Sequence, residues 1–158
     1  MNSTEKIEAS KAAKDLGNTF FKAGRFRQAQ AKYKSALGFI EPGPNFSDEE
    51  KLQLKDHKLS LYLNLAAVKL KVLDYKEVIE NCNKALGLDQ ESVKALFRRA
   101  QALFHTSLFV EAKRDLTQAA QLSPQDKDIR QLLDKVNQRL KVIHDKEKKA
   151  FSNMFASD

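Results

Sequence analysis

Apolar positions recur along this chain with the period of an α-helix, in segments separated by short breaks that are polar or contain Gly or Pro. We expect helices at about residues 5–23, 25–40, 47–73, 76–86, 92–106, 109–122 and 125–155. Gly24 is predicted to form a turn, whereas the stretch EPGPNF after Ile40 cannot continue a helix. Ser47 with Glu50 three residues later is typical of a capping box, with Phe46 before it as a staple. The pattern therefore predicts an all-α fold.

Three of these segments repeat one another. AKDLGNTFFKAGRFRQAQAKYKSAL starts at Ala13, YLNLAAVKLKVLDYKEVIENCNKAL at Tyr62 and LFRRAQALFHTSLFVEAKRDLTQAA at Leu96. Small residues occupy three equivalent positions in the copies: Gly17, Ala66 and Ala100; Ala29, Val78 and Ala112; Ala36, Ala85 and Ala119. The second and third copies are offset by 34 residues, and the first and second by 49, which is 34 plus an insertion of 15. A period of 34 is that of the tetratricopeptide repeat, a helix–turn–helix unit.

These repeats organise the chain as a single domain. The predicted parts are repeat 1 at about 10–43, an insertion loop at 41–47 with a lengthened first helix of repeat 2, repeat 2 at about 59–92, repeat 3 at about 93–126 and a C-terminal helix at about 125–155. Stacked helical hairpins form a right-handed superhelix in which the first helix of each repeat lines a concave groove. We expect the first half of the C-terminal helix to cap the third repeat.

Composition narrows the function classes. Of the 158 residues 42% are hydrophobic, which allows a packed core, and the net charge of +7 suggests an acidic partner. No stretch is long and apolar enough to suggest a membrane span, and the start of the chain lacks the apolar core of a secretory signal. The single Cys82 fits a reducing compartment, so we expect a cytoplasmic or nuclear location. The three histidines lack metal-ligand spacing, and no catalytic, cofactor or metal site is predicted.

Polar residues at groove-facing positions make a candidate binding site. Lys14 and Asn18 are four residues apart on the first helix, and Lys94 and Arg98 have the same spacing in repeat 3. Asn64 occupies the position in repeat 2 that Arg98 occupies in repeat 3. Three cations and two amides without a carboxylate suit a peptide C-terminus that ends in an acidic residue, because charge-assisted hydrogen bonds hold carboxylates well.

Residues one turn further on extend this site. We expect Phe21 and Ala67 to form a small apolar pocket, and Gln101 to bond the peptide backbone. Arg99 is predicted to point away from the groove toward a neighbouring helix, and Cys82 to be buried and inert.

The stretches GNTFFKAGRFRQAQAKYKSAL, LNLAAVKLK, NCNKALGLD and VKALFRRAQAL, with the insertion before a lengthened helix, resemble the tetratricopeptide domain of the chaperone-binding immunophilins, both FKBP-type and large cyclophilin co-chaperones. The resemblance implies a carboxylate clamp for the C-terminal Met-Glu-Glu-Val-Asp (MEEVD) of heat-shock protein 90. Its residues would be Lys14, Asn18, Asn64, Lys94 and Arg98.

The same resemblance implies a motif after the last repeat, EKKAFSNMF, which supports chaperone binding and in which Phe151 replaces the more usual Tyr. It also implies calmodulin as a partner of the C-terminal helix. These immunophilins carry a prolyl isomerase domain that we do not find in these residues, so the chain itself is not expected to be an enzyme.

Two alternatives to the heat-shock protein 90 tail stay open. The heat-shock protein 70 tail shares the final Glu-Glu-Val-Asp, and the sequence does not separate the two. A nucleic-acid or acidic-surface binder would explain the net charge, but the chain lacks aromatic–basic interleaving and any nucleic-acid motif. We therefore do not expect nucleic acid as a partner. We also do not expect a membrane as a partner, because no stretch suggests a membrane span.

Overall fold

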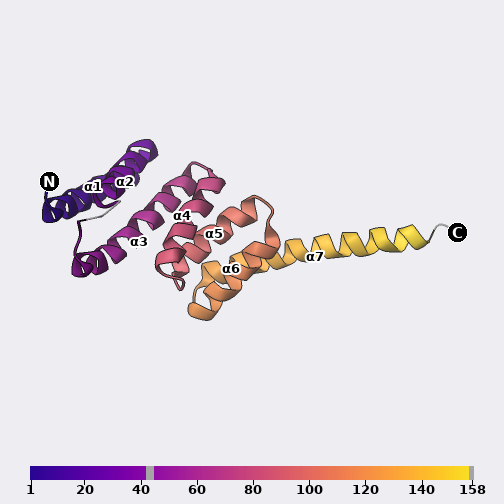
Figure 1. Ribbon diagram of the computed structural model, residues 1–158. Helices are drawn as coiled ribbons and strands as arrows, with labels where there is room; N and C mark the ends of the chain where they lie inside the picture. Colours follow the sequence, from indigo (N-terminus) through magenta and orange to yellow (C-terminus); the bar gives the residue numbers. More distant parts are fainter. Residues whose placement is uncertain (42–44, 157–158) are drawn as a thin grey trace.

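The computed structural model describes residues 1–41 and 45–156, and every regular element in that part of the chain is a helix. The helices are α1 (Ser3–Lys22), α2 (Phe26–Ile40), α3 (Asp48–Lys71), α4 (Tyr75–Leu88), α5 (Val93–His105), α6 (Phe109–Leu122) and α7 (Lys127–Phe155). Helices α1 to α6 form three hairpins that stack side by side, while α7 packs on α6 and then projects from the stack (Figure 1). The predicted all-α superhelical repeat fold is confirmed.

The turns between paired helices lie at positions that are related by the repeat offsets. Gly24, Leu73 and Ser107, at equivalent positions, have φ angles of 74°, 63° and 63°, in the left-handed region. Only Gly adopts this conformation without steric cost, so Leu73 and Ser107 each carry strain of about 1 kcal/mol. The helix expected over about residues 47–73 is present as α3, which ends at Lys71 just before this turn.

Small residues let the helices of each hairpin approach closely. Ala66 and Ala100 are fully buried at the first of the three repeated positions. At the equivalent Gly17, an added Cβ would lie 2.6 Å from Cε1 of Tyr33, so the α1–α2 contact has no room for a side chain. Lys69, at the position that Phe20 and Leu103 occupy in the other repeats, is buried, and its Nζ pairs with Glu77 on α4 at 2.7 Å.

The predicted cap of α3 is confirmed. The Ser47 N–H donates to Glu50 Oε1 at 3.0 Å, and the Glu50 N–H donates back to Ser47 Oγ at 3.1 Å. Phe46 is buried just before this capping box. Residues 42–44 of the predicted insertion loop lie outside the described residues.

Helix α7 takes the place of the first helix of a fourth repeat. It starts at Lys127, 34 residues after the start of α5 at Val93. Ile129 and Val136 are fully buried against the third hairpin, so the first half of α7 caps the stack as expected. Residues 141–156 are all exposed on the projecting half (Figure 1). No helix in the described part of the chain is both long and apolar enough to cross a bilayer.

Candidate functional site

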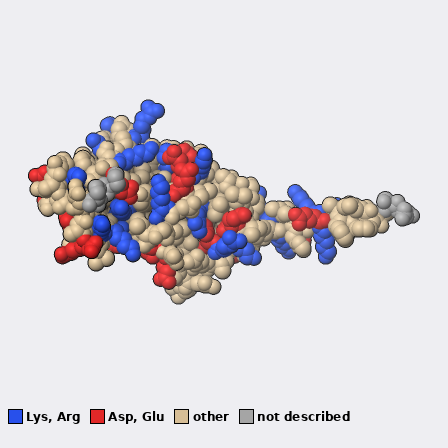
Figure 2. All heavy atoms as spheres, viewed as in Figure 1, with Lys and Arg blue, Asp and Glu red and all other residues tan. Residues whose placement is uncertain are grey.

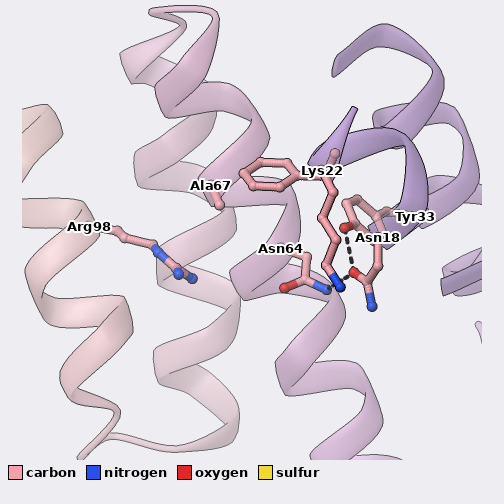
Figure 3. A pocket seen from close by; sticks show the side chains of 7 residues that line it. Asn18, Lys22, Tyr33, Asn64, Ala67 and Arg98 are labelled. Carbon is pink, nitrogen blue, oxygen red and sulfur yellow. Dashed lines mark hydrogen bonds between the residues drawn. The ribbon is translucent and has the colours of Figure 1, made fainter. Parts of the chain in front are cut away.

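A pocket of about 210 Å³ opens between α1, α3 and α5 on the face where these helices line the groove (Figure 3). Its lining consists of Asn18, Phe21, Lys22, Tyr33, Asn64, Ala67 and Arg98. The structure thus brings together three of the predicted clamp residues, Asn18, Asn64 and Arg98, from three successive repeats. The predicted apolar pair Phe21 and Ala67 lies in the same pocket.

The amide of Asn18 is oriented by two hydrogen bonds. The Tyr33 hydroxyl donates to Asn18 Oδ1 at 2.6 Å, and Asn64 Nδ2 donates to the same oxygen at 3.2 Å (Figure 3). Burial raises the pKa of Tyr33, so its hydroxyl keeps the proton that it donates. Both bonds use the amide oxygen of Asn18. Its Nδ2 group is a separate donor, and it bonds no acceptor among the described residues.

Arg98 is a partly buried cation that has no anionic partner among the described residues. Its Nη1 donates to the Leu63 carbonyl oxygen at 2.9 Å, which fixes the guanidinium at the pocket wall. No carboxylate of the described residues forms an ion pair with it. Burial lowers the pKa of Arg98, because the charged guanidinium is partly removed from water. A bound carboxylate would supply a counterion.

Arg99, next to Arg98 in the sequence, does have an anionic partner. Its Nε and Nη2 donate to the two carboxylate oxygens of Asp115 on α6, at 2.7 and 2.6 Å, and its Nη1 donates to Asn83 on α4 at 2.9 Å. The prediction that Arg99 turns away from the groove is confirmed. Cys82 is fully buried on α4, and burial raises the pKa of its thiol to about 12, as expected for an inert thiol.

The remaining two clamp residues lie one helical turn away from the pocket. Lys14 is half-buried on α1, four residues before Asn18, and Lys94 is exposed in the first turn of α5, four residues before Arg98. Neither lines the pocket itself. Each shares a helix face with a residue that does, so both cations flank one end of the pocket. Their part in a clamp stays a prediction.

The groove continues beyond this pocket. A second hollow of about 450 Å³ shares Phe21, Ala67 and Arg98 with the first and contains the predicted Gln101. A third of about 340 Å³, between α5 and α7, shares Gln101 and His105 with the second. The three hollows therefore adjoin one another along successive repeats, and we call them together the channel.

Sequence reasoning missed two lining residues of the first pocket. Tyr33 was not among the predicted site residues, yet its hydroxyl orients Asn18. Lys22 lies four residues after Asn18, just as Lys14 lies four residues before it, so the same helical spacing could have revealed it. His105, to which no chemistry was assigned, lines the second and third hollows and stacks on Tyr75 with ring centres 5.0 Å apart.

Charge is spread over the surface outside the groove. In the view of Figure 2, basic and acidic side chains intermingle over the helical body, and both kinds occur on the projecting helix. Among the described residues, no group of three or more His, Cys, Asp and Glu side chains is placed to hold a metal ion.

Comparison with known proteins shows which proteins this chain resembles in sequence and in fold. No family model matches the chain. The peptidyl-prolyl cis-trans isomerase FKBP4 of Bos taurus is 39% identical over 155 residues, which cover 98% of this chain and 34% of that protein. The C-terminal tetratricopeptide-containing domain of an FK506-binding protein from Plasmodium falciparum is 33% identical, with a TM-score of 0.86 over 92% of this chain and 97% of that domain. The myosin chaperone UNC-45 from C. elegans, solved with an Hsp90 peptide, is 32% identical, with a TM-score of 0.71 over 92% of this chain and 15% of that one.

Stacked helical hairpins with a polar groove define a tetratricopeptide repeat domain. Within that class, the chain belongs to the tetratricopeptide domains of the FKBP-type immunophilins. It spans about a third of the length of the FKBP4 relatives that it matches.

Proposed function

We propose that this domain is a co-chaperone module that binds the acidic C-terminal MEEVD tail of heat-shock protein 90. The observation that carries the proposal is the pocket itself, where Asn18 and Arg98 present unused donors and no carboxylate lines the wall. A ligand with two carboxylates close together, as at an acidic C-terminus, matches this arrangement. The Hsp90 peptide bound to the related UNC-45 supports the same ligand class.

In this proposal, Lys14, Asn18 and Asn64 hold the main-chain carboxylate. Lys94 and Arg98 hold acidic side chains of the tail. Hydrogen bonds to charged groups contribute about 1.5–3 kcal/mol each, less the cost of ordering a flexible peptide. The wall formed by Phe21 and Ala67 receives a small apolar side chain.

The heat-shock protein 70 tail is the alternative ligand, because the shared Glu-Glu-Val-Asp fits the same pocket. We assign no isomerase activity to these residues and propose that such activity belongs to another part of an immunophilin that contains this domain. A cytoplasmic location also remains a proposal.

Calorimetric titration with acetylated MEEVD and with its C-terminal amide tests the proposal. We expect micromolar affinity for the free acid, on the order of −8 kcal/mol, and at least a tenfold loss for the amide. Lys94→Ala and Arg98→Ala should each weaken binding similarly, because each removes a cation that faces a carboxylate. Lys113→Ala on the exposed side of α6 is the matched control and should bind as the unmodified domain does. Equal affinity for acid and amide would contradict the clamp.

A further inference from the structure

The repeat offsets place basic side chains at one further position of each groove-lining helix. Lys22, Lys71 and His105 are equivalent by the offsets of 49 and 34, and each is the last residue of its helix. The same offset leads to Arg139 on α7, and Lys135 lies one turn before it. We call these five residues the basic row. All are exposed, and no ion pair among the described residues involves any of them.

The row follows the channel formed by the three hollows. Lys22 lines the first hollow, Lys71 the second and Lys135 the third, while His105 lies between the last two. With Arg98, four permanent cations line the channel against one carboxylate, that of Asp128 in the third hollow. The channel is therefore cationic well beyond the predicted clamp.

Interaction with the helix dipole is the simplest alternative reason for a cation at a helix C-terminus. The outer helices α2, α4 and α6 serve as an internal comparison, and none has a basic residue in its last turn. Lys135 and Arg139 lie in the middle of α7, where the dipole has no effect. The row thus follows the groove, and helix ends alone do not explain it.

We propose that the basic row binds acidic residues upstream of the clamped tail in the same extended ligand. This inference rests on the proposed function, because the clamp fixes where the ligand ends. Packed helices lie about 8–10 Å apart, and an extended peptide advances about 3.3 Å per residue. One step between helices therefore spans about three residues, and acidic residues at every third upstream position match the row.

The test compares two acetylated peptides that end in MEEVD. One carries the upstream extension Asp-Ser-Gly-Asp-Ser-Gly, and the other carries the same extension with Asn in place of each Asp. Because the row is exposed, each ion pair is weak, and we expect the Asp peptide to bind about three- to tenfold more tightly at about 50 mM salt. The ratio should fall toward one at about 0.3 M salt, where screening is strong.

Two double variants identify the residues responsible. Lys71→Gln with Lys135→Gln should bring the ratio of the two affinities close to one. Lys76→Gln with Lys113→Gln removes the same charge from the outer helices α4 and α6 and should preserve the ratio.

The measured affinities distinguish the inference from a helix-dipole role, from nucleic-acid binding and from failure of the clamp. Equal affinity for the Asp and Asn peptides, or an advantage that survives Lys71→Gln with Lys135→Gln, overturns the inference. A helix-dipole role alone would lower the thermal stability of that variant and leave the ratio unchanged, which also overturns it. A single-stranded oligonucleotide that displaces the Asp peptide at equal concentration would assign the row to nucleic acid instead. Failure of the free pentapeptide to bind better than its amide contradicts the proposed function itself, a separate result.

Discussion

At the scale of single residues, the pocket depends on a contact behind its wall, between Gly17 on α1 and Tyr33 on α2. An added Cβ at Gly17 would lie 2.6 and 2.7 Å from two ring carbons of Tyr33. That ring is only 2% exposed, so it has little room to move, and its hydroxyl orients the Asn18 amide. Gly17, which does not line the pocket, therefore controls the geometry of Asn18, which does.

Gly17→Ala should therefore lower both stability and peptide affinity. Replacing a Gly within a helix by Ala stabilises the fold by up to about 1 kcal/mol. At Gly17 the clash with Tyr33 destabilises it by about 1–3 kcal/mol, which outweighs that gain. We expect a net loss of about 1 kcal/mol in the free energy of unfolding in urea, with weaker MEEVD binding by calorimetry. Gly38→Ala on α2 is the matched control, because no heavy atom lies within 4 Å of its added Cβ. It should stabilise the fold, and the same gain at Gly17 would contradict the argument.

At the scale of elements, the lengthened α3 is joined to the first hairpin through a buried imidazole. Ser10 on α1 donates its hydroxyl proton to the Ala36 carbonyl oxygen on α2 at 2.7 Å. Its Oγ lies 2.8 Å from His57 Nε2 on α3, and because its own proton is donated to Ala36, it accepts a hydrogen bond from the Nε2–H. Burial lowers the pKa of His57, and the nearby charges of Lys14 and Lys11 lower it further, whereas Asp15 opposes them. A neutral His57 thus holds three helices together.

This arrangement predicts a loss of stability in mild acid. The pKa of the His57 imidazole is near 6.5 in the unfolded chain and lower in the folded domain. Between these two pKa values the unfolded state therefore binds more protons than the folded state. The contribution of His57 is complete above about pH 7 and declines as the pH falls below about 6.5, by at most about 1.4 kcal/mol per unit. Urea unfolding at several pH values measures this.

His57→Gln keeps a donor for Ser10 but does not titrate, so its stability should change less between about pH 7.5 and 5.5. His144→Gln removes an imidazole from the exposed half of α7 and should keep the slope of the unmodified domain. Equal slopes for His57→Gln and the unmodified domain would show that His57 is not the titrating group.

At the scale of the whole molecule, the repeat register explains what the sequence could predict. Identical offsets at the small positions predict Asn64 and Arg98 at one groove-facing position of successive repeats, because each repeat buries the same faces. Asn18 follows from the helix face that it shares with Lys14. The Asn18–Tyr33 hydrogen bond could not be predicted, since it depends on how side chains of two different helices meet. The sequence also did not predict that α7 projects, because its apolar spacing continues to Ile143, which is 40% exposed in the structure.

The projecting half of α7 gives the last prediction. Deleting residues 145–158 removes three Lys residues and three acidic residues, so the side-chain net charge is unchanged. The described residues of this segment are exposed and line none of the three hollows. We expect the free energy of unfolding to change by less than about 0.5 kcal/mol, whereas Ile129→Ala in the buried half should cost about 2–5 kcal/mol.

Pentapeptide affinity should be equally unaffected by the deletion, and calorimetry measures it directly. The resemblance of EKKAFSNMF to a motif that supports chaperone binding leads to a different expectation for intact heat-shock protein 90. If the truncated domain binds the chaperone more weakly but the MEEVD peptide equally well, the projecting helix contacts a part of the chaperone other than its tail. A parallel loss for the pentapeptide would instead require the end of α7 to fold back toward the groove, against the exposed position that it has in the structure.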